Sequence, residues 1–324
     1  MKSISRRAAL AAAFALAIAG PAVADTWPSK PIHLIVPFPA GGGTDIIARE
    51  LANQITNQAK WTFVVENRAG SGGNIGVDFA AKAQPDGYTI VIGQTSNLAI
   101  NPTLYSKLPY DPTKDFTPVS LVGSSPLTLV VASNSQYKTL ADLVKAAKAK
   151  PGSINFATSG SGTVAHLATE MFQKEAGIKL VHIPYKGASQ GVVDVIGGSV
   201  ELYMSSIPTL IGHIRNGKLR ALTVTSAKRV ADLPNVPTIA ESGYKGFDAV
   251  TWFGILGPAK MPPEAVAKLN SEIVRALKSP ELQKKMTEQG VDLASSTPEQ
   301  FGALIKTDIA KWGKVVKESG AKVD

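Results

Sequence analysis

The pattern of hydrophobic and polar positions along the chain predicts strands alternating with helices, in a unit that occurs twice. In the first unit, an apolar strand runs into a glycine-rich loop. An amphipathic helix follows, with Ile46, Ile47, Leu51 and Ile55 on one face. Its predicted elements are a strand at 32–38, a helix through 46–55, a strand at 63–65, a loop at 66–73, a short helix ending at 83 and a strand at 88–92.

The second unit repeats this order about 120 residues later, and the spacing from Thr44 to Arg68 equals that from Thr163 to Gly187. Strands and helices that alternate at this length predict parallel sheets with right-handed crossovers, and two such units predict two similar α/β lobes. The predicted elements are a strand at 154–157, a helix at 164–172, a strand at 180–183, a helix through 195 and a strand at 200–204.

The connections between the units predict where the chain changes lobe. Glycine and proline gather at 123–126 and glycine at 243–248. Thr297, followed by a proline and by Gln300, predicts the start of a C-terminal helix that packs back on the first lobe. The expected organisation is a signal peptide at 1–24, the first lobe at 25–124, the second lobe at 125–246, and a return to the first lobe with C-terminal helices at 247–324.

The first 24 residues have the pattern of a cleavable export signal. Lys2, Arg6 and Arg7 precede an apolar run at 8–19, and Ala22-Val23-Ala24 is a typical cleavage site. The run is shorter than the roughly 20 apolar residues needed to span a bilayer. The pattern fits general secretory or twin-arginine export. Because the chain has no cysteine, we expect no lipid anchor, disulfide or thiolate metal site.

The charge of the chain gives a second constraint on function. The 34 lysines and arginines exceed the 25 aspartates and glutamates, for a net charge of +9. The signal segment holds three of the basic residues and no acidic one, which leaves 9 − 3 = +6. The lysines concentrate in predicted helices at 138–150 and 278–285 and are not interleaved with aromatic residues, so we expect solvated helix faces and no nucleic-acid partner.

The two glycine-rich loops are the candidate ligand site. Each follows the carboxyl end of a strand, where ligands bind in open α/β sheets, and each precedes a helix whose N-terminal amides attract anions. Thr44, Ser159, Ser161 and Thr163 offer hydroxyl donors. Two facing loops of this kind predict a site in which both lobes bind one carboxylate. The alternative for each loop is a tight turn and a helix cap without a ligand.

The same residues match the motifs of enzymes only in part. Gly160-Ser161-Gly162-Thr163-Val164-Ala165 fits a dinucleotide-binding G-x-G-x-x-A pattern, but Tyr185-Lys186-Gly187 stands where a ribose-binding acid belongs. No nucleophile elbow is present, and His166 with Glu170 does not make a zinc site alone. We therefore expect no catalytic residues, no metal and no cofactor.

Several motifs together resemble a known family. They are the stretch from Trp27 through Pro37-Phe38-Pro39-Ala40-Gly41-Gly42-Gly43-Thr44-Asp45, and Glu66-Asn67-Arg68-Ala69-Gly70-Ser71-Gly72-Gly73-Asn74, Pro85-Asp86-Gly87-Tyr88, Ser159-Gly160-Ser161-Gly162-Thr163, His182-Ile183-Pro184-Tyr185-Lys186-Gly187 and Gly217-Lys218-Leu219-Arg220-Ala221-Leu222. In this order the chain resembles Bug-type receptors, the extracytoplasmic solute-binding proteins of tripartite tricarboxylate transporters. The resemblance covers essentially the whole chain after the signal segment.

The resemblance implies a two-lobed, clam-shell periplasmic-binding-protein fold of type II, without catalysis. It implies a monomer in the periplasm that holds a small carboxylate between its lobes, with help from ordered waters, and delivers it to membrane transporter subunits. A receptor that presents its ligand to a signalling partner is the alternative. The implied ligand-binding residues are Phe38, Ala40, Gly41, Gly42, Gly43, Thr44, Asp45, Asn67, Gly73, Thr95, Ser96, Ser159, Gly160, Ser161, Gly162, Thr163, Lys186, Gly187 and Ser205. Arg68 is a further possible anion ligand, although a surface salt bridge fits it better.

One departure from the family pattern bears on the ligand. After Gly197-Gly198-Ser199-Val200 the family often has an aspartate and later a Phe-Asp pair, whereas this chain has Glu201 and Met204-Ser205. If that strand end lines the site, a negative group is missing. The departure favours an organic acid without an amino group.

Overall fold

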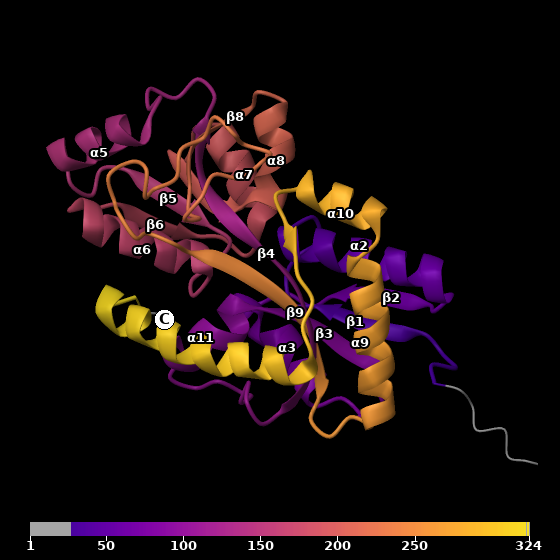
Figure 1. Ribbon diagram of the computed structural model, residues 1–324. Coiled ribbons are helices and arrows are strands. Elements are labelled where there is room, and N and C mark those ends of the chain that lie inside the picture. The colour runs from indigo at the N-terminus through magenta and orange to yellow at the C-terminus, as the bar shows by residue number, and fades with distance from the viewer. Residues whose placement is uncertain (1–26, 322, 324) are drawn as a thin grey trace, which may run out of the picture.

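The computed structural model describes residues 27–321 and residue 323, which form two α/β lobes joined by long strands (Figure 1). The predicted signal peptide at 1–24 lies outside the described residues. In the described part, no helix is long and apolar enough to cross a bilayer.

The first lobe is built on three parallel strands, β1 (Ile32–Val36), β2 (Phe63–Asn67) and β3 (Thr89–Gln94), in the order β2-β1-β3. The helix α2 (Gly43–Ala59) buries Ile47, Leu51 and Ile55 of the predicted stripe against this sheet, whereas Ile46 is half-buried. The short helices η1 (Ser71–Gly73) and α3 (Asn74–Ala81) complete the first repeat.

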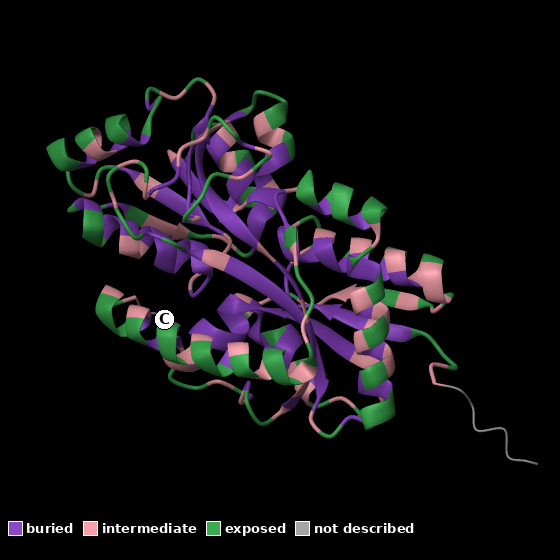
Figure 2. Ribbon diagram, in the orientation of Figure 1, coloured by how far each residue is buried: buried purple, intermediate pink, exposed green. Residues whose placement is uncertain are grey.

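The second lobe repeats the arrangement with β5 (Asn155–Thr158), β6 (Val181–Pro184) and β7 (Leu202–Ser206), also parallel. The helix α6 (Val164–Ala176) follows β5, and α7 (Ala188–Ile196) follows β6. The lobe also holds α5 (Leu140–Ala149), α8 (Ile207–Arg215) and β8 (Leu219–Val224). Figure 2 shows that the strands of both lobes are buried, while the helices keep exposed outer faces.

Two antiparallel strands connect the lobes. The 17-residue strand β4 (Phe116–Ala132) pairs with β9 (Val250–Pro258) as far as Pro126, and from Leu127 onward it pairs with β7 and β8. The short strand β10 (Asp292–Leu293) pairs with β4 near Gly123. One continuous strand therefore contributes to the sheets of both lobes.

The last third of the chain is mainly helical. The helices α9 (Pro263–Leu277) and α10 (Pro280–Thr287) cover the first lobe. Helix α11 (Pro298–Ser319) starts at the predicted Thr297–Gln300 capping box. It packs against the first-lobe segments η2 (Ser96–Ile100) and α4 (Asn101–Leu104), as predicted, and also against α6 of the second lobe.

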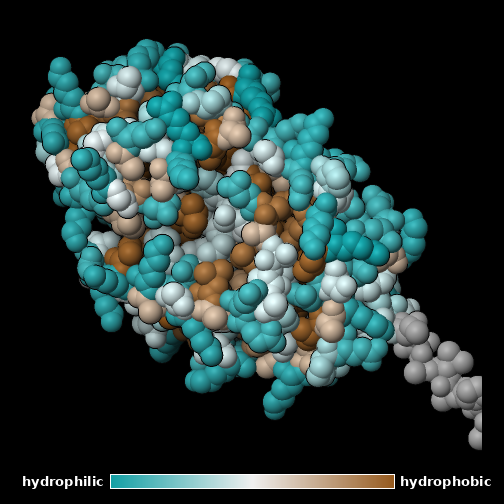
Figure 3. Space-filling model, viewed as in Figure 1, coloured by the Kyte–Doolittle hydropathy of each residue, from teal (hydrophilic) through white to brown (hydrophobic). Residues whose placement is uncertain are grey.

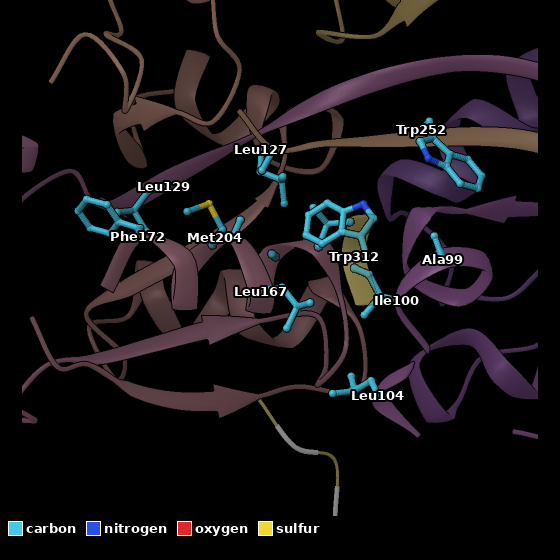
Figure 4. Packing of buried hydrophobic residues seen from close by; sticks show 14 of the residues in the cluster. Ala99, Ile100, Leu104, Leu127, Leu129, Leu167, Phe172, Met204, Trp252 and Trp312 are labelled. Atoms are coloured by element: carbon cyan, nitrogen blue, oxygen red, sulfur yellow. The ribbon is translucent and has the colours of Figure 1, made fainter. Parts of the chain in front are cut away.

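Buried side chains join the two lobes around α11. Figure 4 shows Trp312 between Leu127 and Leu167 on one side and Ile100 on the other. Trp312 is 2% exposed and belongs to one hydrophobic cluster with residues of both lobes. The predicted two-lobed α/β fold class is thus confirmed, whereas the residue boundaries assigned to the lobes stay a prediction.

Candidate ligand-binding site

A small cavity of about 50 Å³ lies between the two lobes. By the same kind of measure, about 10–15 Å³ is enough for one water molecule, so several water-sized groups fit. Residues of both lobes and of the connecting strands line it: Phe38, Pro39, Gly42, Gly43, Thr44, Gln94, Ser96, Leu127, Ser159, Thr163, Val164, Ala165, Gly187, Ala188, Ser205, Ser206, Thr209 and Thr251.

The N-termini of α2, α6, α7 and α8 all reach this cavity. Each contributes lining residues from its N-cap or first turn, such as Gly43 on α2, Val164 on α6, Ala188 on α7 and Ser206 at the start of α8. The first amides of a helix have no partner within the helix, and the aligned peptide dipoles place about half a positive charge there. The cavity is therefore surrounded by groups that attract an anion.

Three of these N-termini lack a side-chain cap. Gly42 and Gly187 precede α2 and α7 and have no side chain that accepts a hydrogen bond, and Ser206 does not cap α8. By contrast, Thr139 and Thr297 cap helices that lie away from the cavity. Apart from the Gly43 amide, which donates to Thr209, the uncapped helix starts present first-turn amides that a bound anion could accept hydrogen bonds from.

Two backbone amides at the cavity donate hydrogen bonds to hydroxyl groups of the opposite lobe. The N–H of Gly43 on α2 donates to Oγ1 of Thr209 on α8, at 3.1 Å. The N–H of Val164 on α6 donates to Oγ of Ser96 in the first lobe, at 3.2 Å. These hydrogen bonds, with Gly187 packed beside Pro39, show that the lobes are in contact around the cavity.

The cavity is lined by apolar surface and by neutral polar groups, without an ionised side chain. Among the described residues that line it there is no lysine, arginine, histidine, aspartate or glutamate. Its side-chain polar groups are hydroxyls and the amide of Gln94. Figure 3 shows hydrophilic side chains over most of the visible face, with near-neutral and hydrophobic residues gathered between the lobes. Any charge on a ligand would be balanced by helix ends rather than by ionised side chains.

The acid next to the lining residue Thr44 is Asp45, and its carboxylate is hydrogen-bonded to the loop before α2. Asp45 is 3% exposed, accepts hydrogen bonds from the Gly41 amide and from Asn67, and forms an ion pair with Arg49 at 3.0 Å. Burial alone would raise the pKa of Asp45, but these hydrogen bonds and the guanidinium outweigh it and lower the pKa. Asn67 also donates to the Phe38 carbonyl oxygen. The network therefore fixes the Phe38–Asp45 loop.

The two threonines compared in the sequence repeat have different positions. Thr163 is the N-cap of α6: its hydroxyl donates to the Gly160 carbonyl oxygen at 2.9 Å and accepts from the His166 amide at 3.3 Å. Thr44 is already the second residue of α2, and its hydroxyl donates to Oε1 of Gln94 at 3.1 Å. The hydroxyl protons of both residues are used within the protein, so the backbone amides are the stronger candidates for ligand contact.

The structure brings part of the predicted site residues to the cavity. The nine that line it are Phe38, Gly42, Gly43, Thr44, Ser96, Ser159, Thr163, Gly187 and Ser205. The ten that do not line it are Ala40, Gly41, Asp45, Asn67, Gly73, Thr95, Gly160, Ser161, Gly162 and Lys186. Ala40, Gly41 and Lys186 are exposed, and Thr95 is buried against the connecting strand, where its hydroxyl accepts the Trp252 amide. Arg68 also lies outside the lining, in an ion pair with Glu66.

Sequence reasoning missed several lining residues. Gln94 ends β3, so the rule that ligands bind beyond strand ends applies to it as well. Ser206 and Thr209 flank Pro208 at the start of α8, where a serine followed by a proline is a helix-start signal. Thr251 lies in the connecting strand β9, and no local pattern marks it as a lining residue.

The departure from the family pattern near the end of β7, at Ser205, lies at the cavity. Ser205 lines it, whereas Glu201 lies before β7 and accepts the Asn155 amide at 3.0 Å. The position next to the cavity is thus neutral. Within the described residues, no group of three or more possible metal ligands comes together.

Comparison with known proteins assigns the chain to a family. Residues 47–321 match the family model described as the tripartite tricarboxylate transporter family receptor. Protein BugT of Bordetella pertussis is 42% identical over 94% of this chain and 94% of that protein. The resemblance seen in the sequence motifs is thereby confirmed.

Solved structures agree with this assignment. A protein of R. palustris with adipate is 34% identical, with a TM-score of 0.89 over 92% of this chain and 100% of that one. MatC of Rhodopseudomonas palustris, with bound malate, is 28% identical, with a TM-score of 0.83 over 90% of this chain and 100% of that one. The chain therefore belongs to the tripartite tricarboxylate transporter receptor family, the Bug-type solute-binding receptors.

Proposed function

We propose that this receptor works in the periplasm, binds a small carboxylate in the cavity between its lobes and delivers it to the membrane subunits of a tripartite tricarboxylate-type transporter. One observation carries the ligand class: four helix N-termini reach a cavity that no ionised side chain lines. Such a cavity favours an anion and offers no partner to a cation.

The charge of the site supports a narrower ligand class. At about half a positive charge for each helix end, four ends supply on the order of two positive charges. A dicarboxylate matches this charge better than a monocarboxylate does. An amino group would find no carboxylate at the lining, since Ser205 stands at the end of β7 and Asp45 is paired with Arg49. Adipate and malate, the ligands of the two structural relatives, are both dicarboxylates without an amine.

A thermal-shift screen of organic acids tests the ligand class. We expect one or more dicarboxylates to stabilise the protein, by about 2.7 kcal/mol at 100 times Kd, because a ligand that binds only the folded state shifts unfolding by mass action. The dimethyl ester of the same acid should give no stabilisation, since it keeps the carbon chain but removes both charges. Equal stabilisation by the acid and its ester would show that the carboxylates are not what the site recognises.

A further inference from the structure

Two stacked histidines, the buried His166 and the half-buried His182, lie next to the second-lobe part of the cavity lining, since His166 directly follows the lining residues Val164 and Ala165. The rings of His166 on α6 and His182 on β6 stack with centroids 4.0 Å apart and planes 12° apart, and His182 also stacks on Phe156 at 4.8 Å. His166 is 5% exposed. Burial lowers the pKa of His166 to about 4, and burial together with the neighbouring His166 lowers that of His182 to about 3. Both rings are neutral near pH 7.

The stacked rings hold the loop that connects β5 to α6. The amide of Gly162 donates to Nδ1 of His166 at 3.3 Å. His182 Nε2 is 2.7 Å from the Thr158 hydroxyl, which in turn donates to the Gly160 carbonyl oxygen. Gly160 and Gly162 have φ values of +143° and +79°, so this loop needs such restraints to keep one conformation.

His166 occupies the N3 position of α6, where a capping box usually has a carboxylate or amide. The Thr163 hydroxyl accepts a hydrogen bond from the His166 amide. The His166 side chain accepts one from the amide of Gly162, one residue before the N-cap. The capping boxes of α5 and α11 have Asp142 and Gln300 at this position. Of these three helices, α6 is the one that faces the cavity, and it is the one whose N3 acceptor is an imidazole.

The imidazole has a clear electrostatic consequence. A carboxylate at N3 would place a negative charge in the first turn of α6, beside Val164 and Ala165 at the cavity, and would repel an anionic ligand. Among the described residues, the ion-pair partner recorded for the ring is an acid, Glu170, with Oε1 3.9 Å from His166 Nε2, and not a cation. The equivalent acid of the first lobe, Asp45, is instead neutralised by Arg49.

We propose that His166, held by its stack on His182, is a positioning residue for ligand binding: its neutral ring fixes the Ser159–Thr163 loop without adding negative charge to the anion site. The proposal rests on the proposed function, because it assumes an anionic ligand in this cavity. His166 does not line the cavity and acts through the loop. This role gives a structural function to the buried His166 and to the half-buried His182 on which it stacks.

Three variants of one position test the proposal, with Kd measured by calorimetry at pH 8 for a dicarboxylate that the wild type binds. His166→Gln supplies a neutral acceptor and should bind within about threefold of wild type. His166→Leu lacks the acceptor and should bind about 3- to 10-fold more weakly, the loss of one ordinary hydrogen bond. His166→Glu keeps an acceptor but adds charge, and should bind on the order of tenfold more weakly than His166→Gln, with a loss that shrinks at high salt.

Hydrogen exchange at the Gly162 amide provides the readout that does not depend on a ligand. Exchange should be fast in His166→Leu and slow in the wild type and His166→Gln. Unchanged Gly162 exchange in His166→Leu, or equal Kd values for the Gln and Glu variants, would overturn the proposal. If the wild type bound no carboxylate, the proposed function would fail instead, whereas the exchange experiment would still report on the loop.

Discussion

Replacing Gly187 with alanine is expected to weaken carboxylate binding about 10- to 150-fold, because the added methyl group would keep the lobes apart. An ideal Cβ at Gly187 would lie 2.4 Å from Cγ of Pro39, and 3.1 Å from its Cδ. Pro39 belongs to the first lobe and its ring cannot rotate away, whereas Gly187 starts α7 in the second lobe. Calorimetry with a stabilising acid would give the change in Kd.

Two controls separate lobe contact from backbone strain. Gly187 has φ = +121°, so alanine also costs conformational energy in the second lobe alone. Gly198→Ala also places alanine at a positive φ, +81°, but with no atom within 4 Å of the new Cβ, and should bind normally. Pro39→Ala in the Gly187→Ala background should restore much of the affinity by removing Cγ and Cδ. If Gly187→Ala bound as tightly as Gly198→Ala, the lobe contact would not govern binding.

Replacing Trp312 with alanine should lower the free energy of unfolding by about 3–5 kcal/mol, the usual cost of a large cavity in a core. The indole is almost fully buried where α11 meets both lobes. Urea denaturation would measure the loss, with the exposed Lys306→Ala on the same helix as a control that stays within about 0.5 kcal/mol of wild type. A loss below about 1 kcal/mol would mean that α11 does not stabilise the joined lobes.

The strands and helices of the two repeats were predictable because each is a local pattern with a physical period. The stripe of Ile47, Leu51 and Ile55 identifies α2, and the Thr297–Gln300 capping box marks the start of α11. The long connection between the lobes was harder. The Gly123–Pro126 stretch has the composition of a break, yet it lies inside β4, which pairs with β9 up to Pro126 and with β7 from Leu127 onward.

The part of the site that could be predicted from the sequence is the part made of loops at strand ends. Glycines at Gly43 and Gly187 marked the positions where backbone of one lobe approaches the other. The two aligned threonines suggested equal roles, but their places differ by two positions relative to the start of the following helix, so only Thr163 is a cap. The contribution of α8 and Thr251 depends on how the lobes face each other, and sequence periodicity carries no information about that.

A crystal structure of the protein with a stabilising dicarboxylate tests the central claim most directly. We expect carboxylate oxygens about 2.7–3.2 Å from first-turn amides of α2 in one lobe and of α6, α7 or α8 in the other, directly or through one ordered water. We also expect no lysine or arginine in contact with the ligand. A carboxylate bound by a basic side chain, or a ligand outside the cavity between the lobes, would contradict it.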